Sequence, residues 1–309
     1  MARIGVAVKT SPPMGRAGHD GAMSSKGQHY WTKDTSQLLR VGEGFRLADV
    51  DPSSSPGYAG GKKEGKSDLV DGAEKMGPLQ ERLYAESRSD ATDASVLLVL
   101  QALDSAGKGG IIRYVVGTVD PQGITIAAFK APSEEELKHD FLWRFEKRLP
   151  TPGLIGVFDR SYYEDVLIAR VRKLAPAKEI ERRYGAIVDF EKQLTDSGTR
   201  IVKVMLHISS DEQKRRLRRR LDRPDKHWKF NPSDIDERGR WDEYMDAYQI
   251  ALERTSSEHA PWYVIPANHK WYARVAVQEL LTEVLEDIDP QWPKATYDIE
   301  AEKKRLAAT

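Results

Sequence analysis

A glycine-rich turn with a single lysine is the part of this chain most able to do chemistry. It reads LDSAGKGG over residues 103–110 and lies between an apolar run at 95–100 and a helix expected at 108–117. Glycines let the backbone approach an anion, free N–H groups at the helix start point toward it, and the helix dipole adds about half a positive charge. The turn therefore predicts a phosphate-binding loop around Lys108, made of Ser105, Ala106, Gly107, Gly109 and Gly110. An ordinary glycine-rich strand-to-helix turn is the plainer alternative.

The turn departs from the strict phosphate-loop pattern GxxxxGK[ST]. Ala102 occupies the first glycine position and Gly109 follows the lysine, so the hydroxyl that commonly binds magnesium is absent. A carboxylate must then hold the metal ion, and Asp104 inside the loop is the natural candidate. Lys108 supplies a point charge that can reach bridging phosphates.

A second acidic motif, FDRSYYED, occupies residues 158–165 after another apolar run. In an open α/β sheet, an aspartate at the carboxyl end of a strand projects into the crevice where ligands bind. Asp159 is therefore predicted to hold magnesium, and Arg160 to neutralise phosphate oxygens with its planar guanidinium. The alternative is a helix start whose cap and first-turn acids come from the same residues, Asp159 or Ser161 with Glu164 and Asp165.

Residues 213–230 are dense in positive charge. Leu217 and Leu221, four residues apart, predict the buried side of a helix whose other faces carry arginines. Beside a phosphate loop, this segment predicts a lid at about 214–240 that closes over a polyanion. Its channel is predicted to be lined by Arg215, Arg216, Arg219, Arg220, Arg223, Lys226 and Lys229. Nucleic-acid binding and a solvated basic face are the competing interpretations.

Strands and helices alternate in the rest of the chain. Apolar runs predict strands at 95–100, 123–129, 154–158, 200–208 and 262–265. Helices are expected at 161–174, 176–197, 236–256 and 269–287. Capping boxes are expected at Ser133 with Glu136 and at Ser210 with Gln213. The alternation predicts an α/β fold with a mostly parallel sheet and right-handed crossovers.

Length and composition exclude several classes of protein. The 309 residues suit one large α/β domain or two small ones, and a formal net charge of zero gives no overall attraction to nucleic acid or anionic membranes. The absence of cysteine excludes disulfides, thiolate metal sites and a cysteine nucleophile. The histidines are scattered without zinc-binding spacing. Since no apolar run reaches the length of a membrane span, a cytoplasmic location is expected.

From about Leu79 to Pro290 the chain resembles the second family of polyphosphate kinases. The resemblance rests on long segments in the same order: LDSAGKGG (103–110), FKAPSEEELKHDFLWR (129–144), GVFDRSYYEDVLIARV (156–171), FEKQLTDSGTRIVKV (190–204), LHISSDEQKRRL (206–217), KHWKFNPSD (226–234) and TSSEHAPWYVIPANHKW (255–271). HDFLWR and NPSD are most similar to the subgroup that accepts AMP as well as ADP, often called class III.

The resemblance implies a P-loop-kinase-like three-layer sandwich with a central, mostly parallel five-stranded sheet, flanking helices and a helical lid. It implies reversible phosphoryl transfer between inorganic polyphosphate and AMP, ADP or ATP, dependent on Mg²⁺, with Mn²⁺ as a substitute. Asp104 and Lys108 match the family's loop, and Asp159 and Arg160 match its second motif, although some relatives carry Asn in place of Asp159. The resemblance places nucleotide contacts at Asp140, Arg144 and Glu164.

The same comparison divides the chain into a phosphotransferase domain at 76–290, a flexible or loosely packed arm at 1–75 and a tail at 291–309. A homodimer or homotetramer is expected by analogy, with no nucleic-acid or membrane partner. Two alternatives stay open: an ATP-dependent small-molecule or nucleoside kinase on the same fold, and a non-catalytic nucleotide- or RNA-binding module. Paired carboxylates argue against the second, because they repel phosphate when no metal is present.

Overall fold

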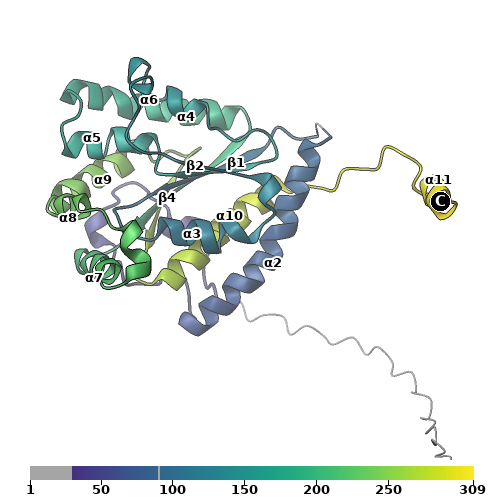
Figure 1. The fold of residues 1–309 in the computed structure, drawn as a ribbon, viewed down its shortest axis with the longest axis horizontal. Coiled ribbons are helices and arrows are strands. Elements are labelled where there is room, and N and C mark those ends of the chain that lie inside the picture. The colour runs from purple at the N-terminus through teal and green to yellow at the C-terminus, as the bar shows by residue number, and fades with distance from the viewer. Residues whose placement is uncertain (1–29, 90) are drawn as a thin grey trace, which may run out of the picture.

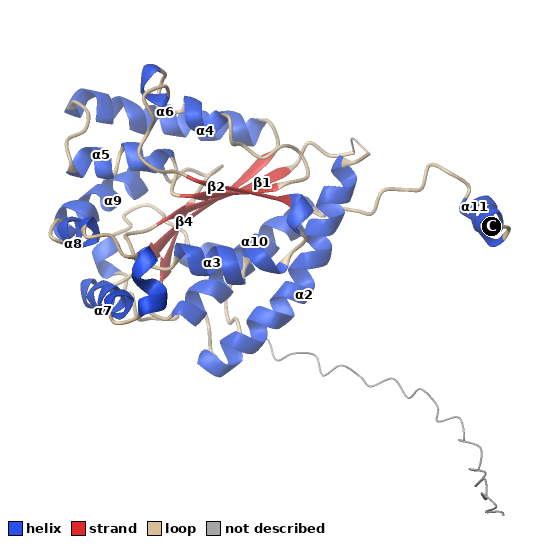
Figure 2. Ribbon diagram, viewed as in Figure 1, coloured by secondary structure: helices blue, strands red, loops and turns tan. Residues whose placement is uncertain are grey.

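The structure is a computed structural model that describes residues 30–89 and 91–309. Its centre is a parallel sheet of five strands in the order β2-β3-β1-β4-β5 (Figures 1 and 2). The strands are β1 Ser95–Gln101, β2 Ile124–Ala128, β3 Ile155–Asp159, β4 Thr199–His207 and β5 Trp262–Pro266. The predicted α/β class and the five-stranded sheet are confirmed, and every strand pair is parallel.

Helices cover both faces of the sheet and complete three layers (Figure 2). One face carries α2 Lys62–Ser87, α3 Lys108–Tyr114 and α10 Lys270–Ile288; the other carries α4 Trp143–Glu146, α5 Ile168–Val171, α6 Ala177–Asp196 and α9 Trp241–Thr255. Alternate side chains of β1 divide between the two cores: Val96 and Leu98 pack on the first face, Leu97 and Val99 on the second. Burial on both faces explains the continuous apolar run that marked this strand in the sequence.

The basic segment forms a helical lid beside the sheet (Figure 1). It consists of α7 Ser210–Leu221, a 3-10 helix Pro224–Lys229 and α8 Ser233–Arg238. The buried side of α7 differs from the prediction, because Leu217 is buried but Leu221 is 49% exposed. Gln213 and Arg216 are buried in its place, so polar contacts hold much of this helix against the body.

Two helix starts differ in detail from the prediction. Ser133 and Glu136 exchange the hydrogen bonds of a capping box, but they open only a 3-10 helix, Glu136–Lys138. The cap of α7 is Ser209, whose hydroxyl accepts from the backbone of Glu212, one residue earlier than the predicted pair. The helix expected at 161–174 is divided into a 3-10 helix, Tyr162–Asp165, and the single turn of α5.

The described part of the predicted arm, residues 30–75, is packed onto the body. Helix α2 begins at Lys62, and residues before it form α1 Thr35–Leu39 and a 3-10 helix, Leu47–Asp49. Trp31 and Tyr58 are buried and pack against each other, and they contact Tyr272 and Trp271 of α10 respectively. These long-range aromatic contacts left no periodic pattern in a sequence rich in Gly, Ser and Lys. The prediction for residues 1–29 lies outside the described residues.

The predicted tail leaves the body and ends in α11 Ile299–Ala307, which stands apart from the other helices (Figure 1). Residues 296–309 are exposed along their whole length. Within the described residues, none of the helices combines the length and apolar character needed to cross a membrane.

Candidate active site

The glycine-rich turn joins β1 to α3 with an unusual backbone. Gly107 has a backbone φ of +130° and Ser105 has a φ of +68°. Residues other than glycine rarely adopt such positive φ angles. Helix α3 begins directly at Lys108, so its first N–H groups lie at the end of the loop. The Lys108 ammonium donates to the carbonyl oxygen of Ala102 at 3.2 Å, which holds the side chain across the turn. This arrangement matches the predicted anion-binding loop.

The second motif lies beside this loop. Asp159 ends β3 and pairs with Leu100 of β1 in the sheet, and the Arg160 backbone N–H donates to the Leu100 carbonyl at 3.1 Å. Arg160 has φ +65°, and its guanidinium donates to Asp104 Oδ1 at 3.0 Å. Backbone strain of this kind at a non-glycine residue collects at functional sites. The structure therefore brings Asp104, Asp159 and Arg160 together at the carboxyl ends of neighbouring strands.

Buried charge surrounds the Arg160 side chain. Burial works against its positive charge, but Glu164, Asp104 and Asp159 outweigh burial and raise the pKa of Arg160. Glu164 lies in a small cavity behind the pair of Asp104 and Arg160, together with Tyr244 and Tyr248. Burial raises the pKa of Glu164, while Arg160 and Lys108 lower it in part. The Glu164 carboxylate therefore stabilises the positive charge of Arg160 from the small cavity that both residues line.

An open cleft of about 700 Å³ connects the loop with the lid. Its lining includes eleven lysine and arginine side chains but only three carboxylates, those of Asp104, Asp159 and Asp234. The predicted residues of the loop and the lid line this one cleft, together with Asp159 and Arg160 of the second motif. Such a concentration of positive charge in a concave site attracts polyanions.

Several lid cations already have acidic partners. Glu212 pairs with Arg215 and Arg216, and Asp225 pairs with Arg223 and Lys226. Asp234 of α8 accepts from Arg220 at 3.2 Å. The lid therefore presents less free positive charge to the cleft than its sequence suggests.

Arg216 differs most from the prediction. Only 5% of it is exposed, and its guanidinium donates to the carbonyl oxygens of Ser105 at 3.1 Å and Ala106 at 2.5 Å. It also donates to the carbonyl oxygens of Ala267 and Asn268, which follow β5. Arg216 thus holds the phosphate loop, β5 and the lid together, and its donors face backbone carbonyls in place of a polyphosphate channel.

The structure does not bring Asp140 and Arg144 into the cleft. Asp140 pairs with Arg182 of α6 at the surface and accepts from the backbone of Leu142 within its own turn. Arg144 is buried, donates to the Lys130 carbonyl at 2.8 Å and lies over the Phe145 ring. Both side chains stabilise the segment between β2 and β3.

The cleft also contains residues that the sequence reasoning missed: Arg113, Tyr114, Trp228, Asn231, Asp234 and Lys270. Asp234 stands in the NPSD segment, which the resemblance had marked without giving it a role. Desolvation raises the pKa of Asp234, and the nearby charge of Asp104 raises it further. Lys270 is the first residue of α10 and follows shortly after the end of β5. Ligand sites of open parallel sheets lie at the carboxyl ends of the strands.

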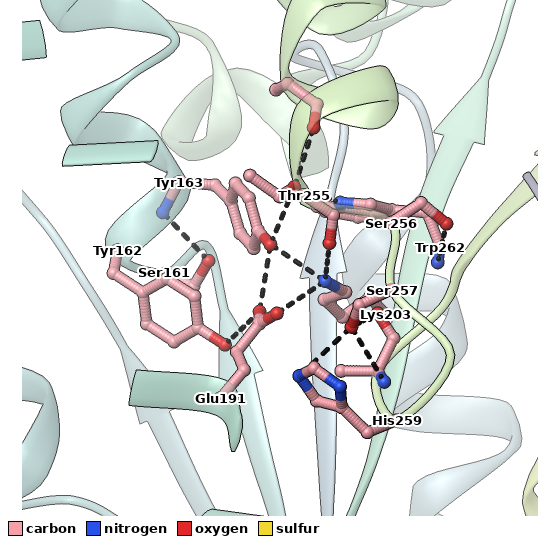
Figure 3. A network of polar contacts seen from close by, with 12 residues as sticks. Ser161, Tyr162, Tyr163, Glu191, Lys203, Thr255, Ser256, Ser257, His259 and Trp262 are labelled. Atoms are coloured by element: carbon pink, nitrogen blue, oxygen red, sulfur yellow. Dashed lines mark hydrogen bonds and ion pairs between the residues drawn. The ribbon is translucent and has the colours of Figure 1, made fainter. Parts of the chain in front are cut away.

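A buried polar network lies behind the second motif (Figure 3). The hydroxyls of Tyr162 and Tyr163 lie 2.8 Å and 2.9 Å from the same carboxylate oxygen of Glu191. The Lys203 ammonium donates to Glu191 Oε2 at 2.6 Å, to the Tyr163 hydroxyl at 2.9 Å and to the Thr255 carbonyl at 2.7 Å. All three of its protons are satisfied. The network fixes the two tyrosines that follow Arg160 in the chain.

Within the described residues, no group of three or more His, Asp or Glu side chains is arranged to hold a metal ion. Asp104 and Asp159 are the strand-end carboxylates that line the cleft beside the phosphate loop. Two carboxylates suit Mg²⁺, which keeps several waters and takes its remaining ligands from substrate phosphates. The donor set of the site therefore fits that ion.

Comparisons with known proteins identify the family of this chain. The sequence profile of Polyphosphate kinase 2 (PPK2) matches residues 61–293. The chain is 45% identical to an AMP/ADP-polyphosphate phosphotransferase of Meiothermus ruber over 250 residues, covering 81% of this chain and 92% of the relative. It is 42% identical to an ADP-polyphosphate phosphotransferase of Rhodopseudomonas palustris over 282 residues, covering 85% and 94%.

A solved structure supports the same assignment. The crystal structure of Polyphosphate Kinase 2 from Arthrobacter aurescens TC1 superimposes with a TM-score of 0.88 at 56% identity, covering 90% of this chain and 98% of that one. The matched profile covers both the loop at 103–110 and the lid. The predicted resemblance is confirmed: the chain belongs to the polyphosphate kinase 2 family.

Proposed function

We propose that this protein transfers phosphoryl groups reversibly between inorganic polyphosphate and the adenine nucleotides AMP, ADP and ATP. The similar proteins of M. ruber and R. palustris carry names for that activity and align over most of their length. The observation that carries the proposal here is the ion pair of Arg160 with Asp104, at 3.0 Å, beside Lys108 in a cleft lined with cations.

The main barrier to this reaction is the repulsion between two polyanions that must meet end to end. Phosphoryl transfer requires alignment and neutralisation of charge more than a covalent enzyme group. We assign Lys108 and Arg160 to the oxygens of the transferred group, where fixed cations in a partly desolvated site stabilise the transition state. The loop N–H groups from Gly107 to Gly110 bind the neighbouring phosphates.

Asp104 and Asp159 are assigned as the residues that hold Mg²⁺, with Mn²⁺ as a substitute. When bound, the ion neutralises phosphate charge and helps to align the donor with the acceptor. A bound cation would offset the repulsion between these two carboxylates and the substrate phosphates. Asp104 also accepts from Arg160, and both side chains line the cleft.

The lid is assigned to exclude water from the transfer step. The assignment is supported by Asp234 of α8, which lines the same cleft as Asp104 and has its pKa raised by desolvation and by the charge of that residue. Exclusion of water favours transfer to a nucleotide over hydrolysis. None of the three predicted nucleotide contacts lines the cleft, because Asp140 and Arg144 are held elsewhere and Glu164 lies in the small cavity beside Asp104 and Arg160.

Three finer assignments rest on the resemblance. HDFLWR and NPSD favour the class III subgroup, and with it the use of both AMP and ADP. A homodimer or homotetramer is expected from the same analogy. The cytoplasm, where nucleotides and Mg²⁺ are abundant, is the expected compartment.

The test is formation of ATP from ADP and polyphosphate with Mg²⁺ and no other phosphoryl donor, followed by the same assay with AMP, GMP and GDP. Turnover with AMP and ADP supports the proposal, and Asp104→Asn and Lys108→Ala should each abolish it while the protein stays folded. Turnover with ATP and a small-molecule acceptor, but none with polyphosphate, would identify the rival kinase. Tight RNA binding without Mg²⁺ or turnover would identify a binding module.

A further inference from the structure

Within the described part of the chain, unpaired cations line the cleft and the pocket behind the loop both in the lid, at Arg219 and Lys229, and outside it, on α3 and α10. Most lid cations are paired with Glu212, Asp225 or Asp234. Three cations contributed by α3 and α10, Arg113, Lys270 and Arg274, have no carboxylate partner within ion-pair distance among residues 30–89 and 91–309. A cation without a counter-ion beside a phosphate loop is available to a ligand anion.

These three side chains are contiguous with the loop. Lys270 lines the main cleft and also a small pocket of about 90 Å³ behind the loop, which it shares with Gly107, Gly110 and Arg274. A methyl group placed on Gly110 would lie 3.5 Å from Arg274 Nη2, so this guanidinium lies against the first turn of α3. Arg113, one turn further along α3, also lines the main cleft.

Tyr114 fixes the directions of the two arginines. The Arg274 guanidinium lies over its ring, with its carbon 3.9 Å from the ring centre, and that of Arg113 lies 5.3 Å from the same centre. Such cation–π contacts hold arginine side chains without neutralising their charge. Arg274 thereby occupies one face of the ring.

The local electrostatics agree with an anion-binding site. Partial desolvation, together with the nearby charges of Arg216, Arg219 and Arg274, lowers the pKa of Lys270 to about 8. Desolvation also lowers the pKa of Arg274. Both shifts mean that the charged forms are disfavoured in the free protein, and a bound anion would relieve this cost.

We propose that Arg113, Lys270 and Arg274 form a subsite for the part of a polyphosphate chain that extends beyond the phosphates bound in the loop. The inference rests on the proposed function and adds the direction in which the chain leaves the reacting end, along the wall of α3 and α10. A linear chain of phosphates offers charge at each unit, which suits three separated cations better than the single phosphate group of AMP does.

The subsite predicts that chain length decides affinity. The double variant Arg113→Ala/Arg274→Ala should raise the KM for long-chain polyphosphate by about tenfold, while the dissociation constant for tripolyphosphate, which fills the loop alone, changes less than about twofold. The KM for ADP should stay unchanged. The affinity for the long chain should also depend less steeply on salt than in the wild type, because fewer counter-ions are released.

Two controls separate charge from structure. Arg113→Lys/Arg274→Lys keeps both charges and should retain most of the long-chain affinity. Arg218→Ala removes a lid arginine that is 84% exposed and does not line the cleft, and it should leave both constants unchanged. Equal losses for the long and the short chain, no loss for either, or a raised KM for ADP alone would each overturn the subsite. A wild-type protein that makes no ATP from polyphosphate would instead refute the proposed function.

Discussion

Arg216 donates to the carbonyl oxygen of Ala106 at 2.5 Å, and this contact joins the lid to the phosphate loop from behind. The same guanidinium reaches Ser105, whose backbone has φ +68°. A loop that binds anions through its N–H groups must turn its carbonyl oxygens away from the ligand, and those oxygens then need donors of their own. Arg216 supplies these donors on the protein side of the loop.

Arg216 and Arg219 should therefore behave differently although both line the cleft. Arg216→Met should lower the free energy of unfolding by about 3 kcal/mol or more, because it leaves buried carbonyls and the partly buried Glu212 without their partner. Arg219→Met should leave stability within about 0.5 kcal/mol and weaken polyphosphate binding, since Arg219 is exposed. Urea denaturation and polyphosphate KM measure the two effects. Equal stability of the two variants would contradict the role given to Arg216.

The sequence predicts the centre of the site well because its residues are local to strand ends. Asp104, Lys108, Asp159 and Arg160 each follow a recognisable buried strand, and parallel strands bring their carboxyl ends to one edge of a sheet. Their convergence on one cleft follows from topology alone. No side-chain packing has to be known to place them.

The sequence does not predict which cations remain free. The pattern of Leu217 and Leu221 indicated that the arginines of α7 face outward, yet Arg216 is buried and Leu221 is half exposed. The reason lies in two carbonyl-bearing segments far apart in the chain, at 105–106 and 267–268, which meet at the Arg216 side chain. Contacts of this range leave no periodic signal, and the same applies to the aromatic packing of Trp31 and Tyr58.

Asp159 should be required for metal binding more than for folding. Asp159→Asn keeps the shape of the side chain but removes its charge, and it should raise the Mg²⁺ concentration that gives half-maximal rate by about tenfold. A magnesium titration of ATP synthesis from ADP and polyphosphate measures this change. The exposed lid variant Asp222→Asn is the matched control and should show the wild-type titration. An unchanged magnesium requirement in Asp159→Asn would remove this residue from the metal site.

Gly107 and Gly109 should respond differently to alanine. Gly107 has φ +130°, so Gly107→Ala strains the backbone and should lower both stability and activity. A methyl group on Gly109 meets no atom within 4 Å, and in the first turn of α3 it should stabilise the fold by up to about 1 kcal/mol. Yet it points into the cleft, so Gly109→Ala should raise the KM for polyphosphate. Thermal unfolding and kinetics separate the two effects; an unchanged KM in Gly109→Ala would show that no phosphate approaches this position.

Lys270 should make polyphosphate binding sensitive to pH. Partial desolvation and the charges of Arg216, Arg219 and Arg274 lower its pKa to about 8, with Glu212 opposing them. A polyanion binds the protonated form, so the affinity for long-chain polyphosphate should fall as pH rises from about 7 to about 9. Lys270→Arg keeps its charge over this range and should flatten the profile. A wild-type KM that does not change in this interval, or an equal rise in Lys270→Arg, would assign the pH dependence to another group.

Lys203 and Glu191 form a buried ion pair, and we expect each charge to stabilise the fold only when the other is present. Lys203→Met leaves the Glu191 carboxylate charged, with both side chains 0% exposed in the native protein, and should cost about 3–5 kcal/mol of unfolding free energy. Lys203→Met/Glu191→Gln removes both charges and keeps an oxygen for the hydroxyls of Tyr162 and Tyr163, so it should recover much of this loss. Urea denaturation of the wild type, both single variants and the double variant measures the coupling. If the double variant loses the sum of the single losses, the two charges do not stabilise each other and the tyrosines after Arg160 must be held by packing alone.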